Sequence, residues 1–146
     1  MNDLLWAIAH HLLAFGIFGL LFAEFVALRG ALNETQIRRI AALDLAYGVL
    51  ALLLVVIGFL RANLAAKGWH YYAHNAFFWA KIATFALVGL LSVPPTIAYI
   101  RWRRADGPPG DAQVRQVRRL LWAEVILFAL LPAFAAAMAR GYGEFS

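Results

Sequence analysis

Residues 68–104 read GWHYYAHNAFFWAKIATFALVGLLSVPPTIAYIRWRR, a long apolar run that carries a lysine inside it. Between Ala76 and Ile100 the only charged residue is Lys81, and this segment is long enough to cross a bilayer as a helix. A lysine inside a membrane costs about 3 kcal/mol on insertion scales, which suggests a functional role. The structural alternative is that Asn75 caps the helix, so that Lys81 lies about 9 Å inside it and extends its amine back to the interface.

The composition is that of an integral membrane protein. Of the 146 residues, 64% are hydrophobic and 14% are charged, whereas soluble domains carry about 25% charged residues. The net charge of +5 comes from basic residues in short loops beside apolar segments, which is typical of membrane proteins and argues against a nucleic-acid partner. Cysteine is absent, which excludes disulfides, thiolate metal sites and iron–sulfur clusters.

Four apolar segments predict a single all-α domain, an integral membrane four-helix bundle with up-down-up-down topology. The expected spans are residues 4–28, 40–60, 76–100 and 120–138. The first is too long for the apolar core of a signal peptide, and we expect it to be retained. Pro94 and Pro95 should kink or locally unwind the third span, because they remove two amide donors.

The distribution of arginine and lysine predicts how the bundle is oriented in a bacterial inner membrane. Most basic residues flank the first and third connections, and few flank the aromatic connection at residues 62–74. Because cytoplasmic loops carry the excess of basic residues, both termini and the aromatic connection are expected to lie outside the cytoplasm.

Basic and imidazole groups gather at one expected depth near the outer face. His10 and His11 lie about 10 Å into the first span if Asp3 caps it, and Lys81 has a similar depth in the third span. The neighbouring polar residues just above this level are Arg61, His70, His74 and Asn75. Three spans and one connection are therefore expected to direct nitrogen groups toward one region.

A second, acidic layer is expected at the inner side. Glu24, Asp44 and Glu124 each lie five residues from an arginine, on its membrane side. A carboxylate at this depth must be paired, hydrogen-bonded or protonated, because a bare charge there is too costly. Two interpretations are open: a proton relay, or structural ion pairs with the nearby arginines. Those arginines are Arg29, Arg39 and Arg119.

Helical phase favours a polar seam through the bundle. At about 100° per residue, His10 and Glu24 fall within about 40° of one another. Tyr47 shares a face with Arg61 and lies three residues after Asp44. Tyr47 is therefore a further candidate for a proton relay or for a structural role.

The histidines allow three interpretations. In the first, they serve structural hydrogen bonds. In the second, His70 and His74 would make a zinc or copper pair if helical, although no carboxylate or sulfur nearby completes that site. The third interpretation is haem ligation by His10 or His11, since imidazole in a four-helix bundle is a suitable axial donor.

In the haem interpretation, Lys81 or Arg61 would face the propionates. A phenylalanine stripe on the face of His11 would line the slot, namely Phe15, Phe18, Phe22 and Phe25.

Several motifs resemble an uncharacterised group of small bacterial membrane proteins, the domain of unknown function 2214. The motifs are IAHHLLAF at 8–15, ALDLAYG at 42–48, KGWHYYAHNAFFWAK at 67–81 and IRWRR at 100–104. The resemblance covers nearly the whole chain, and it implies a membrane fold without specifying an activity.

A more distant resemblance is to the four-helix haem-dependent protoporphyrinogen IX oxidases. Those enzymes carry a tryptophan followed by an essential histidine in helix one, as Trp6 and His11 do here, and an essential lysine near the start of helix three, where Lys81 stands. The basic and aromatic motif that follows helix one in those enzymes is missing. The spacing in that family favours His11 as the ligand, whereas helical phase with Glu24 favours His10.

These observations lead to one functional hypothesis and one alternative. The hypothesis is a b-type haem or porphyrin bound near the outer leaflet, with His10 or His11 as the iron ligand, His74 as a second ligand, and a redox or porphyrin-related role. Lys81 would be the catalytic residue and, with Arg61, would clamp anionic groups. The alternative is a non-enzymatic component, either a small-solute or proton pathway or an assembly subunit.

The partners expected under either hypothesis are membrane lipid and, for a redox role, a quinone or porphyrin. A homo-oligomer or a larger membrane complex is also open, because Gly16, Gly19 and Gly58 would permit close helix contacts.

Overall fold

Five helices account for most of the chain. The structure is a computed structural model that describes residues 2–64 and 68–144. Its helices are α1 (Asn2–Ala27), α2 (Glu34–Leu64), α3 (Gly68–Ala73), α4 (Ala76–Trp102) and α5 (Asp111–Ala139). In the expected aromatic connection, residues 65–67, Lys67 among them, lie outside the described residues. Residues 62–64 belong to α2, and residues 68–73 form the short helix α3.

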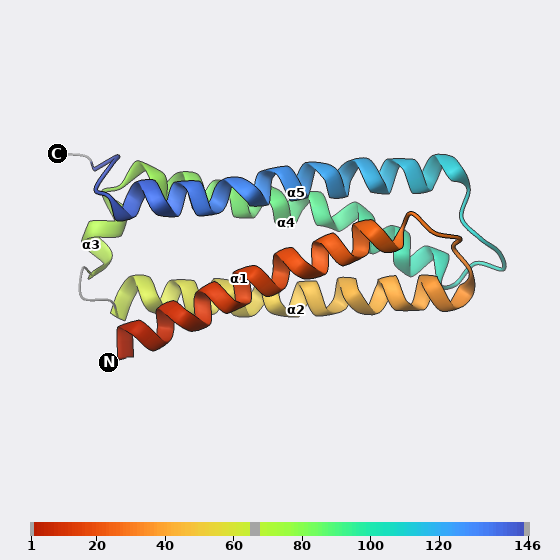
Figure 1. The fold of residues 1–146 in the computed structure, drawn as a ribbon, viewed down its shortest axis with the longest axis horizontal. Coiled ribbons are helices and arrows are strands. Elements are labelled where there is room, and N and C mark those ends of the chain that lie inside the picture. Colours follow the sequence, from red (N-terminus) through yellow and green to blue (C-terminus); the bar gives the residue numbers. More distant parts are fainter. Residues whose placement is uncertain (1, 65–67, 145–146) are drawn as a thin grey trace.

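The four long helices form an up-and-down bundle, which confirms the predicted fold class (Figure 1). Each is long and apolar enough to cross a membrane. Helices α1 and α2 make one hairpin, and α4 and α5 make the other. Both described ends of the chain and α3 lie at one end of the bundle, while the α1–α2 and α4–α5 connections lie at the opposite end (Figure 1).

The helices extend beyond the apolar segments that predict them. Helix α2 begins at Glu34 and α5 at Asp111, both in polar sequence. A helix satisfies its own backbone hydrogen bonds, so its backbone does not stop where the apolar composition does. Helix α1 begins at Asn2, so Asp3, from which the depth of His10 and His11 is counted, lies within the helix.

Helix α4 runs without interruption through Pro94 and Pro95, so the expected local unwinding does not occur. Side-chain hydroxyls add hydrogen bonds in this stretch: Ser92 donates to the carbonyl of Gly89 at 2.7 Å, and Thr96 donates to the carbonyl of Ser92 at 3.1 Å. Such bonds help a proline-containing helix to persist inside a membrane.

Small residues bring α1 and α2 together. A Cβ atom on Gly16 would lie 3.1 Å from Leu50 Cδ1, and one on Gly58 would lie 3.2 Å from His10 Cε1. These two glycines therefore serve contacts within the chain. The outer surface is apolar, as a lipid-facing surface should be: Phe15 is 70% exposed and Leu90 is 69% exposed.

Asn75 ties the start of α4 to the C-terminal tail. It is fully buried, and its side chain caps α4 by accepting hydrogen bonds from the amides of Phe77 and Phe78. Its Nδ2 donates to the Tyr142 carbonyl at 3.0 Å, and the next amide, Ala76, donates to the Gly143 carbonyl at 2.7 Å. The expected cap is thus confirmed, with a second role in holding the tail.

Replacing Asn75 with alanine should destabilise this end of the bundle. The substitution leaves two α4 amides and the Tyr142 carbonyl without their partner, so we expect the free energy of unfolding to fall by about 1–3 kcal/mol. Unfolding in mixed detergent micelles, followed by tryptophan fluorescence, measures this loss. Asn63→Ala is the matched control, because Asn63 is exposed and, among the described residues, its side chain bonds only to the carbonyl of Phe59 within its own helix. Equal losses in the two variants would contradict the assignment.

Candidate functional site

The inner carboxyl groups meet in the interior of the bundle. Glu24 of α1 is 2% exposed and Glu124 of α5 is 0% exposed, while Asp44 of α2 is half-buried. The three groups interact electrostatically with one another, so they form one cluster drawn from three helices. The sequence places all three at a similar depth, and the fold brings them together.

Each of these carboxyl groups accepts a hydrogen bond from a hydroxyl on another helix. The Tyr99 hydroxyl donates to Glu24 Oε2 at 3.3 Å, and the Tyr47 hydroxyl donates to Glu124 Oε2 at 3.5 Å. The Thr96 hydroxyl donates to Asp44 Oδ1 at 2.8 Å. We call these six residues the inner acid cluster: Glu24, Asp44, Tyr47, Thr96, Tyr99 and Glu124.

The ion pairs with Arg29, Arg39 and Arg119, one of the two interpretations of the acidic layer, do not form. In residues 2–64 and 68–144 the one salt bridge joins Arg38 to Glu34. Arg39 and Arg119 lie five residues from their carboxylates within α2 and α5, a rotation of about 140°, so each points away from the face that carries that carboxylate. Arg29 follows the end of α1 and lies in the connection. Arg29 instead lies over the Phe25 ring, 4.8 Å from its centroid.

One oxygen of each buried glutamate remains without a partner. Oε1 of Glu24 and Oε1 of Glu124 are buried and accept no hydrogen bond. A buried polar atom without a partner costs free energy unless the group carries a proton or meets a further donor. The cluster is therefore suited to hold protons.

The neighbouring histidines of α1 have different surroundings, although their rings meet edge-on with centroids 6.1 Å apart. The His10 ring packs against Gly58 of α2, and its Nδ1 is buried without a hydrogen-bond partner. The charges of Lys81 on α4 and Arg61 on α2 both act on His10. We call His10, Arg61 and Lys81 the outer basic cluster.

His11 points away from this cluster. It is exposed, and its Nδ1 is within hydrogen-bonding distance of the Ala7 carbonyl, at 2.6 Å. The phenylalanine stripe expected on its face is divided: Phe15 and Phe22 are exposed, whereas Phe25 is buried and Phe18 stacks on the buried Phe128. The four phenylalanines lie on one broad face of α1, but two of them point to lipid and two pack against protein.

The outer basic cluster lacks an acidic counterpart. Among the residues that the structure describes, Arg61 and Lys81 form no salt bridge. Arg61 Nε is buried without a hydrogen-bond partner, and the Lys81 amine lies 5.8 Å from the centroid of the Phe78 ring. Partly buried cations without an anion are unfavourable, so this arrangement is suited to an anionic ligand.

His70 and His74 belong to the outer end, on and just after α3. Their rings stack at 4.1 Å, and His74 Nδ1 is 2.8 Å from the His70 carbonyl. Both are exposed. Within residues 2–64 and 68–144, no group of three or more histidine, aspartate or glutamate side chains is arranged to hold a metal ion.

Sequence reasoning missed the hydroxyl partners on α4. Thr96 and Tyr99 were not singled out, although they follow Ser92 at helical spacing on the face that also carries Lys81. That spacing was the available signal. It does not by itself show which carboxylates the hydroxyls meet, because those lie on other helices.

Comparison with known proteins gives a family for the chain. The family described as "Predicted membrane protein (DUF2214)" matches residues 2–143. The chain belongs to the DUF2214 family. No curated protein and no solved structure matches it. The DUF2214 resemblance is thereby confirmed, while the comparisons give no support to the resemblance to the protoporphyrinogen IX oxidases.

Proposed function

We propose that this DUF2214 protein binds a b-type haem, or a related porphyrin, at the outer basic cluster, and that it has a redox or porphyrin-related role. The observation that carries the proposal is the half-buried His10, whose Nδ1 is buried without a partner and which interacts with the charges of Arg61 and Lys81. Among the described residues, neither cation forms a salt bridge. Imidazole is a common axial ligand, and cations suit the propionates of haem.

The geometry favours His10 over His11 as the iron ligand. His10 faces the neighbouring helices, where the absent side chain of Gly58 leaves room for its ring. His11 is exposed and lies on the outer side of α1, away from Arg61 and Lys81. His74 remains the candidate for a second ligand, because α3 and the outer basic cluster lie toward the same end of the bundle.

Bound haem would supply electron transfer. In that arrangement Arg61 holds an anionic group, Lys81 either holds one or acts in catalysis, and a quinone or a porphyrin serves as redox partner or substrate. The inner acid cluster lies further along the bundle and would supply protons. A homo-oligomer or a larger membrane complex is compatible with this role.

The haem proposal predicts different results for the two neighbouring histidines. The detergent-purified protein should show a sharp absorption band after dithionite reduction, at nearly one haem per chain. His10→Ala should lower haem affinity at least about tenfold, because the iron ligand is lost. His11→Ala is the matched control and should retain haem. A wild-type spectrum without haem bands, unchanged after haem is added, would contradict the proposal.

We further propose that the protein lies in a bacterial inner membrane with both termini outside. The basis is the arginine excess at the connections opposite the termini. Because the chain has no cysteine, single cysteines report orientation cleanly. In spheroplasts, Tyr142→Cys should react with a membrane-impermeant maleimide, and Asp106→Cys should react only after permeabilisation. The reverse pattern would invert the topology.

A second candidate function, a proton pathway, is favoured by the inner acid cluster. Two fully buried glutamates that bond to tyrosines, rather than to arginines, are groups of the kind that mark proton paths in membrane proteins. This candidate requires no cofactor, and it stands even if the haem proposal fails.

The pathway predicts proton flux through reconstituted protein. In vesicles with a potassium diffusion potential and an internal pH dye, the wild type should acidify the lumen faster than protein-free vesicles do. Glu124→Gln should slow this at least about tenfold, because the amide cannot carry the proton. Asp106→Asn, in the exposed α4–α5 connection, is the control. Wild-type flux no faster than that of empty vesicles would remove this candidate.

A further inference from the structure

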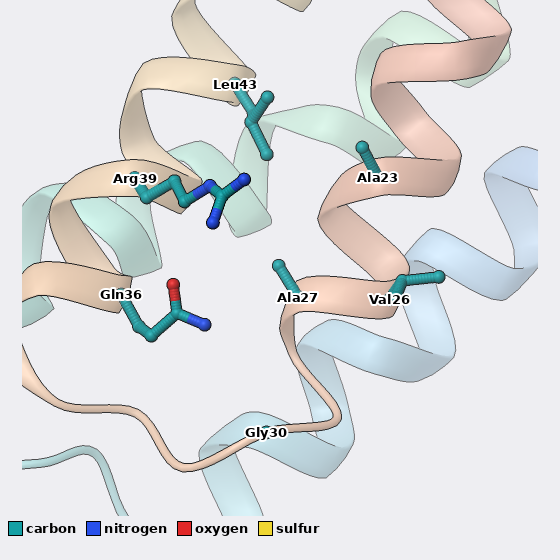
Figure 2. A pocket seen from close by; sticks show the side chains of 7 residues that line it. All are labelled: Ala23, Val26, Ala27, Gly30, Gln36, Arg39 and Leu43. Atoms are coloured by element: carbon teal, nitrogen blue, oxygen red, sulfur yellow. The ribbon is translucent and has the colours of Figure 1, made fainter.

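A pocket opens between α1 and α2 at the end of the bundle that carries their connection (Figure 2). Its volume is about 480 Å³. It is lined by Ala23, Val26, Ala27, Gly30, Gln36, Arg39 and Leu43. The lining residues come from the last turns of α1, the connection and the first turns of α2. None of them belongs to the inner acid cluster or the outer basic cluster.

The polarity of the lining changes with depth. Gln36 and Arg39 lie in the first turns of α2, and their polar groups face the α1 alanines across the opening (Figure 2). Leu43 lies about one helical turn deeper on α2, and Ala23 about one turn deeper than Ala27 on α1. The pocket is therefore polar toward the helix ends and apolar toward the middle of the membrane.

The positive charge at this pocket is available. Arg39 is exposed. The single salt bridge found among the described residues joins its neighbour Arg38 to Glu34 at 2.6 Å, so Arg39 takes no part in it. No acidic residue lines the pocket. A guanidinium beside an amide offers several donors in fixed directions, which suits the oxygens of a phosphate.

We propose that this pocket binds one anionic phospholipid of the surrounding leaflet. The phosphate accepts hydrogen bonds from Arg39 and Gln36, and an acyl chain lies against Ala23, Ala27 and Leu43. A free anion would use only the polar end, whereas a phospholipid matches both the charge and the apolar depth. Basic pockets between membrane helices are known to hold anionic headgroups in this way. The site is independent of the haem and proton proposals.

Native mass spectrometry of the full chain tests the proposal, with phosphatidylglycerol and phosphatidylcholine of identical chains as the probes. The wild type should retain one phosphatidylglycerol in preference to phosphatidylcholine. Arg39→Gln should reduce that retention about fivefold or more, which corresponds to one basic residue at a membrane surface. Arg38→Gln, one residue away, should leave it unchanged. Circular dichroism checks that both variants keep their helices.

A second variant tests the apolar half of the pocket. Ala27→Phe fills the wall opposite Arg39 without changing charge, so it should also lower phosphatidylglycerol retention. Equal losses for Arg38→Gln and Arg39→Gln would overturn the site in favour of diffuse surface charge. Equal retention of the two lipids would overturn its charge selectivity. Full competition by glycerol phosphate, or an unaffected Ala27→Phe variant, would overturn the phospholipid in favour of a free anion.

Discussion

Burying carboxyl groups in an apolar bundle constrains the whole arrangement of helices. Glu24 and Glu124 are enclosed, so each must meet a donor, and the donors are Tyr99 and Tyr47 on other helices. These bonds run from α1 to α4 and from α2 to α5, so they link the α1–α2 hairpin to the α4–α5 hairpin. In lipid, where apolar packing gives little preference for one partner over another, such polar contacts specify how the hairpins fit together.

The bundle carries two polar layers of opposite sign that do not neutralise each other. The carboxyl groups are bonded to hydroxyls, while Arg61 and Lys81 form no salt bridge within the described residues. A protein that needed only stability would pair these charges or replace them with apolar side chains. Keeping them apart leaves the inner layer able to hold protons and the outer layer able to receive an anion, which is why both proposed functions begin from these layers.

Adjacent residues on one helix point in directions about 100° apart, so they meet different surroundings and take different roles. His10 faces Gly58 on α2, whereas His11 faces outward beside its own backbone. The pair Arg38 and Arg39 divides in the same manner: Arg38 pairs with Glu34 along the helix, and Arg39 lines a pocket with α1. In both pairs, two adjacent side chains contact different parts of the structure.

The sequence by itself determined the four membrane helices, the cap at Asn75 and the two polar depths, because apolar length, capping chemistry and depth along a helix are local properties. Only the tertiary structure decided that Thr96 and Tyr99 serve the carboxyl groups in place of the arginines. It also placed His10, which helical phase favours and the family spacing does not, against Gly58 of α2. These outcomes depend on how each helix is rotated against its partners. That rotation is set by contacts between residues far apart in the chain. Local periodicity groups residues on one face, as it groups His10 with Glu24, but it does not say which helix that face meets.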